Sequence, residues 1–227
     1  MLTVLRRAAA IAVALMLPAL AVPGQVQTKE SQAAMTPSKA LDALKAGNAR
    51  FLAGKGERRD LKAQVAATAS GQYPFAAILS CMDSRASAEL VLDQGIGDIF
   101  SIRVAGNIVD TDDLGSLEYA VAAAGAKLIV VMGHTSCGAV KGAIDDVKLG
   151  NLTELLAKIQ PAVHAAGPGT SKDKAYVTKV AEQNVRLVMK EIRSRSAVIA
   201  PLLSSGKVGM AGAIYDVETG RVAFLAD

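Results

Sequence analysis

The chain has 227 residues, of which 51% are hydrophobic and only 4% aromatic, and its formal charge at pH 7 is +4. This length suits one domain, or at most two, with a buried core, while the small, scattered charge excludes a nucleic-acid-binding footprint and a disordered polyelectrolyte. Two cysteines exclude a disulfide-dense scaffold, and with two histidines they are the few residues available for soft ligands or nucleophiles.

The first 21 residues have the three parts of a secretory signal peptide. Two arginines precede an uncharged stretch over 8–22, and Ala19 and Ala21 form an A-x-A-like cleavage site. The alternative is a membrane anchor, but a span needs about 20 apolar residues, and Pro18 interrupts a shorter segment. We therefore expect residues 1–21 to be removed on export to the periplasm, which leaves no stable membrane insertion and lowers the charge to +2.

Two helices are expected at the start of the folded domain. Residues 22–35 are rich in Gln, Thr, Ser and Lys and are expected to form a polar linker, so that the domain spans 36–227. Thr36 is a good N-cap and is followed by proline at the first helical position. An apolar stripe then predicts a helix over about 37–54, and a second amphipathic helix covers about 60–69.

Short apolar runs separated by helix-like sequence make up the rest of the domain. The runs that read as strands are 75–79, 99–104 and 128–132, and 208–217 with 221–225 as a terminal hairpin. Runs that are apolar on both faces and alternate with helices indicate a buried parallel sheet. A long helix is expected over 174–196. We therefore expect an α/β fold with a mostly parallel central sheet flanked by helices, an antiparallel edge strand and an N-terminal helical arm.

Both cysteines and one histidine follow predicted strands directly. Cys81 comes after the first run, and His134 and Cys137 come after the third. In an open parallel sheet, ligands bind at the carboxyl ends of the strands. The three side chains are therefore expected at the same edge of the sheet.

Three chemistries fit this group of residues. Cys81 and Cys137 could form a disulfide, which export allows, or Cys137 could be a nucleophile with His134 as its base. The third and favoured interpretation is a metal site, because His-x-x-Cys spacing lets both side chains point at one ion while Cys81 supplies a second thiolate. Two thiolates and one imidazole form a ligand set that zinc uses when its fourth position stays open.

Asp83 and Arg85 lie two and four residues beyond Cys81. Two thiolates cancel the formal charge of Zn²⁺, so the metal acidifies water less than an all-imidazole site would. A carboxylate held by a guanidinium could assist by accepting a hydrogen bond. Asp83 could instead occupy the fourth metal position and switch the site off, or the two residues could form an ordinary surface ion pair.

At these residues the sequence resembles the β-class carbonic anhydrases. The matching motifs include Cys-Met-Asp-Ser-Arg at 81–85, Arg-Val-Ala-Gly-Asn at 103–107 and Gly-His-Thr-Ser-Cys-Gly-Ala-Val at 133–140, and the similarity covers most of 36–227. The resemblance implies one zinc ion per chain on Cys81, His134 and Cys137, with Asp83 and Arg85 as the catalytic dyad. It also implies reversible hydration of carbon dioxide and a homodimer, or a multiple of dimers, whose N-terminal helices wrap the partner.

The resemblance also distinguishes two types of site. Members that close the site with the aspartate usually carry tryptophan three residues before the first cysteine, where this chain has Ile78. Gln72 instead matches a substrate-binding glutamine of the open type, although it could also be a loop residue between a helix and a strand. We therefore expect the open type of site, in which water occupies the fourth zinc position and the Asp83 carboxylate pairs with Arg85. Ala86-Ser87 replaces the Val-Pro of many members and leaves fine substrate preference open.

Two other functions remain as alternatives. Carbon disulfide or carbonyl sulfide hydrolysis uses similar motifs on this scaffold, and a non-catalytic zinc-binding or disulfide protein belongs to a different class.

Among the other polar residues, Ser136 is expected to cap the helix that begins near Cys137, and His164 is expected at an exposed helix end. Asp93 and Asp98 are expected to be surface or loop acids.

Overall fold

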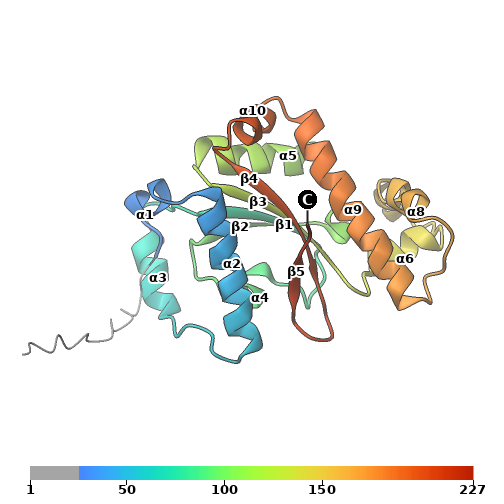
Figure 1. The fold of residues 1–227 in the computed structure, drawn as a ribbon, viewed down its shortest axis with the longest axis horizontal. Helices are drawn as coiled ribbons and strands as arrows, with labels where there is room; N and C mark the ends of the chain where they lie inside the picture. Colours follow the sequence, from blue (N-terminus) through green and yellow to red (C-terminus); the bar gives the residue numbers. More distant parts are fainter. Residues whose placement is uncertain (1–25, 227) are drawn as a thin grey trace, which may run out of the picture.

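The structure is a computed structural model that describes residues 26–226. Within these residues a five-stranded sheet has the order β2-β1-β3-β4-β5 (Figure 1). Its strands are β1 (Ala76–Ser80), β2 (Ile99–Arg103), β3 (Leu128–His134), β4 (Gly209–Tyr215) and β5 (Val222–Phe224). The first four strands pair in parallel, and β5 pairs antiparallel to β4. The expected fold class is therefore confirmed, including the antiparallel edge strand.

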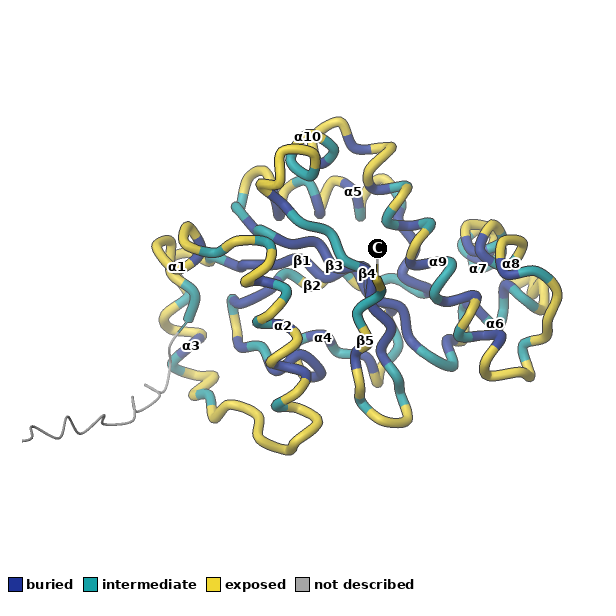
Figure 2. The backbone as a smooth tube through the Cα atoms, in the orientation of Figure 1, coloured by how far each residue is buried: buried dark blue, intermediate teal, exposed yellow. Residues whose placement is uncertain are grey.

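Helices lie on both faces of the sheet. They are α1 (Lys29–Ala33), α2 (Pro37–Leu52), α3 (Leu61–Thr68), α4 (Ala88–Val91), η1 (Ala105–Asn107), α5 (Thr111–Glu118), η2 (Tyr119–Ala123), α6 (Gly138–Ile144), α7 (Leu152–Ala157), α8 (Gln160–Ala166), α9 (Lys174–Arg195) and α10 (Ile199–Ser204). Side chains of α2 and α4 form one apolar cluster with the sheet, and those of α5, α6, α8, α9 and α10 form the other. Every residue of β1 and β3 is buried between these layers (Figure 2). These two strands are the rigid centre from which the site is built.

Helix α2 begins and packs as its sequence requires. The Thr36 hydroxyl caps the helix by accepting a hydrogen bond from the Lys39 amide at 3.2 Å, and Ala40 and Leu44 are fully buried. These side chains pack on the sheet of their own chain. Phe51 and Leu52, at the end of the same apolar stripe, each expose 39% of their surface, and the wrapping of a partner by the N-terminal helices that the resemblance implied remains a prediction.

The stretch expected as a polar linker contains a helix. In α1, Thr28 caps the first turn, and Gln32 lies buried beneath it. Gln32 Nε2 donates hydrogen bonds to the carbonyl oxygens of Pro74 and Ala124 at 2.7 and 2.8 Å. The expectation of a linker through residue 35 is therefore wrong from Lys29 onward, because one long amide side chain ties this segment to the amino end of β1.

The expected signal peptide, 1–21, lies outside the residues that the structure describes. Among the helices of 26–226, none combines the length and the apolar character needed to cross a membrane.

Candidate functional site

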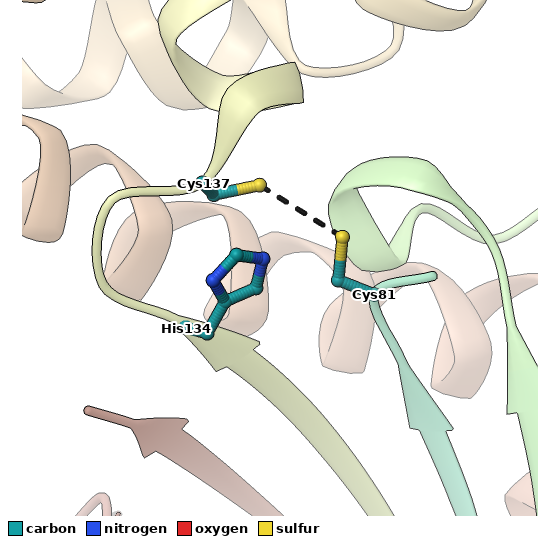
Figure 3. A group of neighbouring side chains, drawn as sticks. All are labelled: Cys81, His134 and Cys137. Carbon is teal, nitrogen blue, oxygen red and sulfur yellow. Dashed lines mark hydrogen bonds between the residues drawn. The ribbon is translucent and has the colours of Figure 1, made fainter. Parts of the chain in front are cut away.

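Cys81, His134 and Cys137 meet at the carboxyl ends of β1 and β3, as predicted. The two sulfur atoms lie 4.0 Å apart, marked by the dashed line in Figure 3, and both cysteines are free. One possible ligand atom from each of the three residues lies within 4.8 Å of the others. All three side chains are buried, so they form a preformed donor set shielded from bulk water.

The turn after β3 brings Cys137 back toward His134. Ser136 adopts a left-handed conformation, with φ of 57°, which reverses the chain. Cys137 is then the N-cap of α6. The expectation that Ser136 caps this helix is wrong, because Ser136 is used for the turn that precedes it.

His134 presents one nitrogen to the two sulfurs. Its Nδ1 lies 2.9 Å from the carbonyl oxygen of Thr135, which makes Nδ1 the protonated nitrogen and leaves a lone pair on Nε2. His134 is 1% exposed, and Nε2 has no hydrogen-bond partner among the described residues. A buried polar atom without a partner is costly, and a metal ligand is the common reason for this tautomer.

Thr135 is itself fixed by the end of β4. Its amide donates to the carbonyl oxygen of Tyr215 at 2.9 Å, and its hydroxyl accepts a hydrogen bond from the Val217 amide at 3.1 Å. The carbonyl that orients His134 is therefore held by the C-terminal hairpin.

The donor set fits zinc. Two thiolates bound at about 2.3 Å in a tetrahedral site lie roughly 3.8 Å apart, close to the 4.0 Å between Cys81 and Cys137. A disulfide needs about 2.05 Å, which these positions do not provide. The unpartnered Nε2 of His134 would complete a set of three ligands.

The two cysteines influence each other's pKa through the contact between their sulfur atoms. The hydrogen bond from the Cys137 thiol lowers the pKa of Cys81 to about 4, against the effect of burial. The resulting Cys81 thiolate, together with burial, raises the pKa of Cys137. A divalent cation that bound both sulfurs would stabilise both cysteines as thiolates, so the difference between their pKa values would no longer leave one of them protonated.

Asp83 and Arg85 lie at the mouth of this group. Arg85 Nε and Nη2 donate to the two carboxylate oxygens at 2.9 and 2.8 Å, and the Arg85 amide adds a third hydrogen bond at 3.0 Å. Asp83 Oδ2 is 3.8 Å from His134 Nε2. The hydrogen bonds from Arg85 hold the pKa of Asp83 well below its ordinary range. Asp83 therefore stays ionised beside the candidate ligands.

Arg103, at the end of β2, holds the backbone of this loop. Its Nε donates to the Cys81 carbonyl at 3.3 Å, and its Nη2 donates to the Asp83 carbonyl at 2.6 Å. The sequence marked Arg103 only as part of a motif, and the structure gives it a defined place in the site.

One contact to Cys81, and a second contact that supports it, could not be predicted from the sequence. The Gly106 amide donates to Cys81 Sγ at 3.3 Å, and Asn184 Nδ2, on α9, donates to the Gly106 carbonyl at 2.8 Å. The sequence carries one hint of these contacts. Asn184 is a polar residue on the otherwise mostly apolar stripe of this helix, between Ala181 and Val185.

Gln72 does not join the site within the chain. It is exposed and precedes β1, whereas Cys81 follows the same strand. The five residues of β1 separate them by about 16 Å, at roughly 3.3 Å per residue. Of the sequence-predicted site residues, Gln72 alone lies near the amino ends of the strands, whereas the others lie near the carboxyl ends.

The two acids expected at the surface or in loops do lie in loops, but both are buried. Asp93 is 8% exposed and pairs with Arg50 and Arg59, each at 2.5 Å. Asp98 is 9% exposed and accepts a hydrogen bond from the Gly95 amide at 2.6 Å. Sequence reasoning failed for Asp93 because its cationic partners lie far away along the chain. His164 lies exposed on α8, as expected.

Comparison with known proteins gives a consistent result. A family model described as "Carbonic anhydrase" matches residues 76–222. Carbonic anhydrase 2 of Mycobacterium tuberculosis is 36% identical over 191 residues, covering 82% of this chain and 91% of that protein. Carbonic anhydrase of Mycolicibacterium smegmatis is 36% identical over 198 residues, covering 82% and 92%.

Solved structures extend this likeness to the fold and its class. The β-carbonic anhydrase CafA of Aspergillus fumigatus superposes with a TM-score of 0.66 at 27% identity, covering 84% of this chain and 91% of that one. A tetrameric β-carbonic anhydrase of Sordaria macrospora gives 0.62 at 28% identity, covering 70% and 84%. With the motifs and the Cys-His-Cys group placed as described, the chain belongs to the carbonic anhydrase family, in its β class.

Proposed function

We propose that the chain catalyses the reversible hydration of carbon dioxide to bicarbonate and a proton with one zinc ion held by Cys81, His134 and Cys137. One observation carries the metal assignment, namely the buried, unpartnered Nε2 of His134 beside two sulfurs 4.0 Å apart. When bound, zinc supplies the Lewis acidity that lowers the pKa of water and makes it nucleophilic near neutral pH.

The protein's own contribution is to orient that water. The Asp83 carboxylate is an acceptor beside the proposed ligands, since its Oδ2 lies 3.8 Å from His134 Nε2. A hydrogen bond from the reacting water to this oxygen would aim the oxygen lone pair of the water at carbon dioxide. Arg85 fixes the carboxylate through two contacts, and Arg103 fixes the loop that carries it.

The position of Asp83 favours an open fourth position. Asp83 could also serve as a fourth ligand, but both of its oxygens accept hydrogen bonds from Arg85 in this structure. Movement onto a metal would break both contacts. A crystal structure of the zinc-loaded protein tests this, and we expect water at the fourth position with the Asp83 carboxylate still paired with Arg85.

We further propose a homodimer, or a multiple of it. Met82, which follows Cys81, and Leu90, on α4, expose 62% and 70% of their surface, and the Sordaria macrospora relatives are described as tetrameric. Gln72 would then meet substrate only if it reached the site of a neighbouring chain, since it is remote from its own. Light scattering on the purified protein tests the assembly, and a monomer that retains full activity would exclude this role of Gln72.

The test of the function is stopped-flow hydration of carbon dioxide with metal content measured on the same sample. We expect one zinc per chain and rapid hydration, and we expect Cys81→Ser and His134→Ala to lose both. Retained metal and full activity in either variant would contradict the site assignment. Rates on carbonyl sulfide and carbon disulfide, measured side by side, test the sulfur-analogue alternative, which faster turnover of either compound would favour.

Export of the chain by residues 1–21 is part of the same proposal. Its support is the order of basic, apolar and small residues in that segment. Mass spectrometry of the protein from a periplasmic extract is expected to show a chain that begins at about residue 22. Full-length protein in the cytoplasm would contradict it.

A further inference from the structure

One polar side chain interrupts the buried face of α9. The buried residues of this helix are Tyr176, Val177, Val180, Ala181, Asn184, Val185, Val188 and Ile192. Asn184 is 2% exposed. A buried amide is costly unless it is hydrogen-bonded, so the partner of Asn184 indicates why an asparagine occupies this position.

That partner leads to the candidate metal ligands. Asn184 Nδ2 donates to the carbonyl oxygen of Gly106 at 2.8 Å, and the Gly106 amide donates to Cys81 Sγ at 3.3 Å. Both contacts are buried. Three segments far apart along the chain are thus linked through a single glycine.

Gly106 needs this support because of its conformation. Its φ is 69°, and a Cβ at this position would lie 2.5 Å from Ile159 Cδ1, so the position favours glycine. Glycine has the freest backbone of all residues, and the amide and carbonyl of Gly106 belong to two different peptide planes. Anchoring the carbonyl plane restricts rotation about Gly106 and thereby fixes the direction of its amide.

We propose that Asn184 is a positioning residue that, by holding the Gly106 carbonyl, aims the Gly106 amide at the sulfur of Cys81. The hydrogen bond fixes the orientation of the sulfur and withdraws electron density from it. Partners of this kind behind a metal ligand commonly change metal affinity by about 10–100-fold when removed. This inference rests on the proposed function, since it assumes that Cys81 binds the metal.

The first test is zinc affinity, measured by competition with a chelator. Asn184→Leu keeps the approximate volume and removes the donor, and Val180→Ala is the control for lost packing on the same buried face. We expect zinc to bind about 10-fold more weakly to Asn184→Leu and within about twofold of wild type to Val180→Ala. Equal losses in the two variants, or no loss in Asn184→Leu, would overturn the proposal.

The second test is the spectrum of the cobalt-loaded proteins. Loss of the amide hydrogen bond makes the Cys81 thiolate a stronger electron donor, so the thiolate-to-cobalt band should move to longer wavelength in Asn184→Leu and stay in place in Val180→Ala. An unmoved band in Asn184→Leu overturns the role of Asn184 alone. A wild-type protein without any thiolate-to-cobalt band refutes the proposed metal site as well.

The wild-type protein provides a test if Asn184→Leu does not fold. In protein loaded with ¹¹³Cd, the amide proton of Gly106 should show scalar coupling to the metal through the sulfur of Cys81. Absence of this coupling, with Cd bound at Cys81, overturns the proposal without any variant.

Discussion

Asp83 and Arg85 meet side on, with two nitrogens of the guanidinium donating to the two oxygens of the carboxylate at 2.9 and 2.8 Å. Such bidentate pairs are geometrically specific as well as stronger than single contacts. The Asp83 side chain is 17% exposed and lies toward the candidate ligands, while that of Arg85 is 52% exposed. The pair therefore places a charged acceptor of fixed orientation at the mouth of the site.

Asp83→Asn tests this orientation. The amide keeps the shape of the side chain but replaces one acceptor oxygen with a donor, so it cannot make the same double contact. We expect zinc to remain bound and turnover to fall roughly 100-fold, as for the loss of a proton acceptor. The measurements are stopped-flow hydration and metal content, with the exposed Asp112→Asn on α5 as control. Unchanged turnover in Asp83→Asn would remove Asp83 from the mechanism.

Thr135→Val tests the link between the hairpin and His134. The substitution removes the hydroxyl that accepts from the Val217 amide but keeps the carbonyl that orients the imidazole. A looser carbonyl should weaken zinc binding by roughly 10-fold, measured by chelator competition. Thr178→Val is the control, because the Thr178 hydroxyl donates to a carbonyl of its own helix at 2.9 Å. Equal affinities for the two variants would show that the hairpin contact is dispensable.

A pair of glycine substitutions tests how α2 is packed. Gly47 lies within α2, and a Cβ there would overlap the carbonyl oxygen of Leu92, so Gly47→Ala should destabilise the protein by about 1–3 kcal/mol or more through overpacking. Gly115 lies within α5, and among the described residues a Cβ added there would meet nothing within 4 Å apart from its chain neighbours and the backbone of its own helix. Gly115→Ala should therefore stabilise by about 1 kcal/mol, the ordinary helix preference. Chemical denaturation measures both, and a stabilising Gly47→Ala would mean that α2 does not pack against its own chain.

Asp93 predicts a pH dependence of stability. Burial alone would raise the pKa of Asp93, but hydrogen bonds from Arg59, Arg50 and the Glu57 amide lower it. A carboxyl with a lowered folded-state pKa contributes its full stabilisation above about pH 4, and this contribution is lost as the pH falls further. We expect Asp93→Asn to cost about 3 kcal/mol at pH 7 and progressively less below about pH 4.

Urea denaturation at several pH values measures this effect. The control is Asp146→Asn, since Asp146 pairs with Lys148 at 2.5 Å but both side chains are more than half exposed. Exposed pairs contribute little, so this variant should resemble wild type throughout. A cost for Asp93→Asn that does not change between pH 7 and pH 3 would rule out an ionic origin.

The strands and the candidate metal ligands could be predicted because each depends on local sequence. Apolar runs that alternate with helices indicate a parallel sheet wherever they occur, and rare residues directly after strands fall at the same edge. The strand β3 extends past the predicted run to His134 because Gly133 and His134 still pair with Ile214 and Tyr215. That pairing depends on a strand remote in sequence and could not be seen from the run itself.

What the sequence did not reveal depends on contacts between distant segments. Asn184 looks like any polar residue on a helix until Gly106 is placed beside it, 78 positions away. Asp93 looks like a loop acid until Arg50 and Arg59 close over it. In both cases the residue type is unremarkable, and only the partner gives it a role.

Because Cys81 and Cys137 are 56 positions apart and follow two neighbouring strands, the donor set exists only after β1 and β3 have paired. The complete donor set is therefore absent from an unfolded chain. An ion that binds the three residues together would favour the native state over the unfolded one and so raise the free energy of unfolding. Chelation should correspondingly leave the sheet intact while lowering the free energy of unfolding.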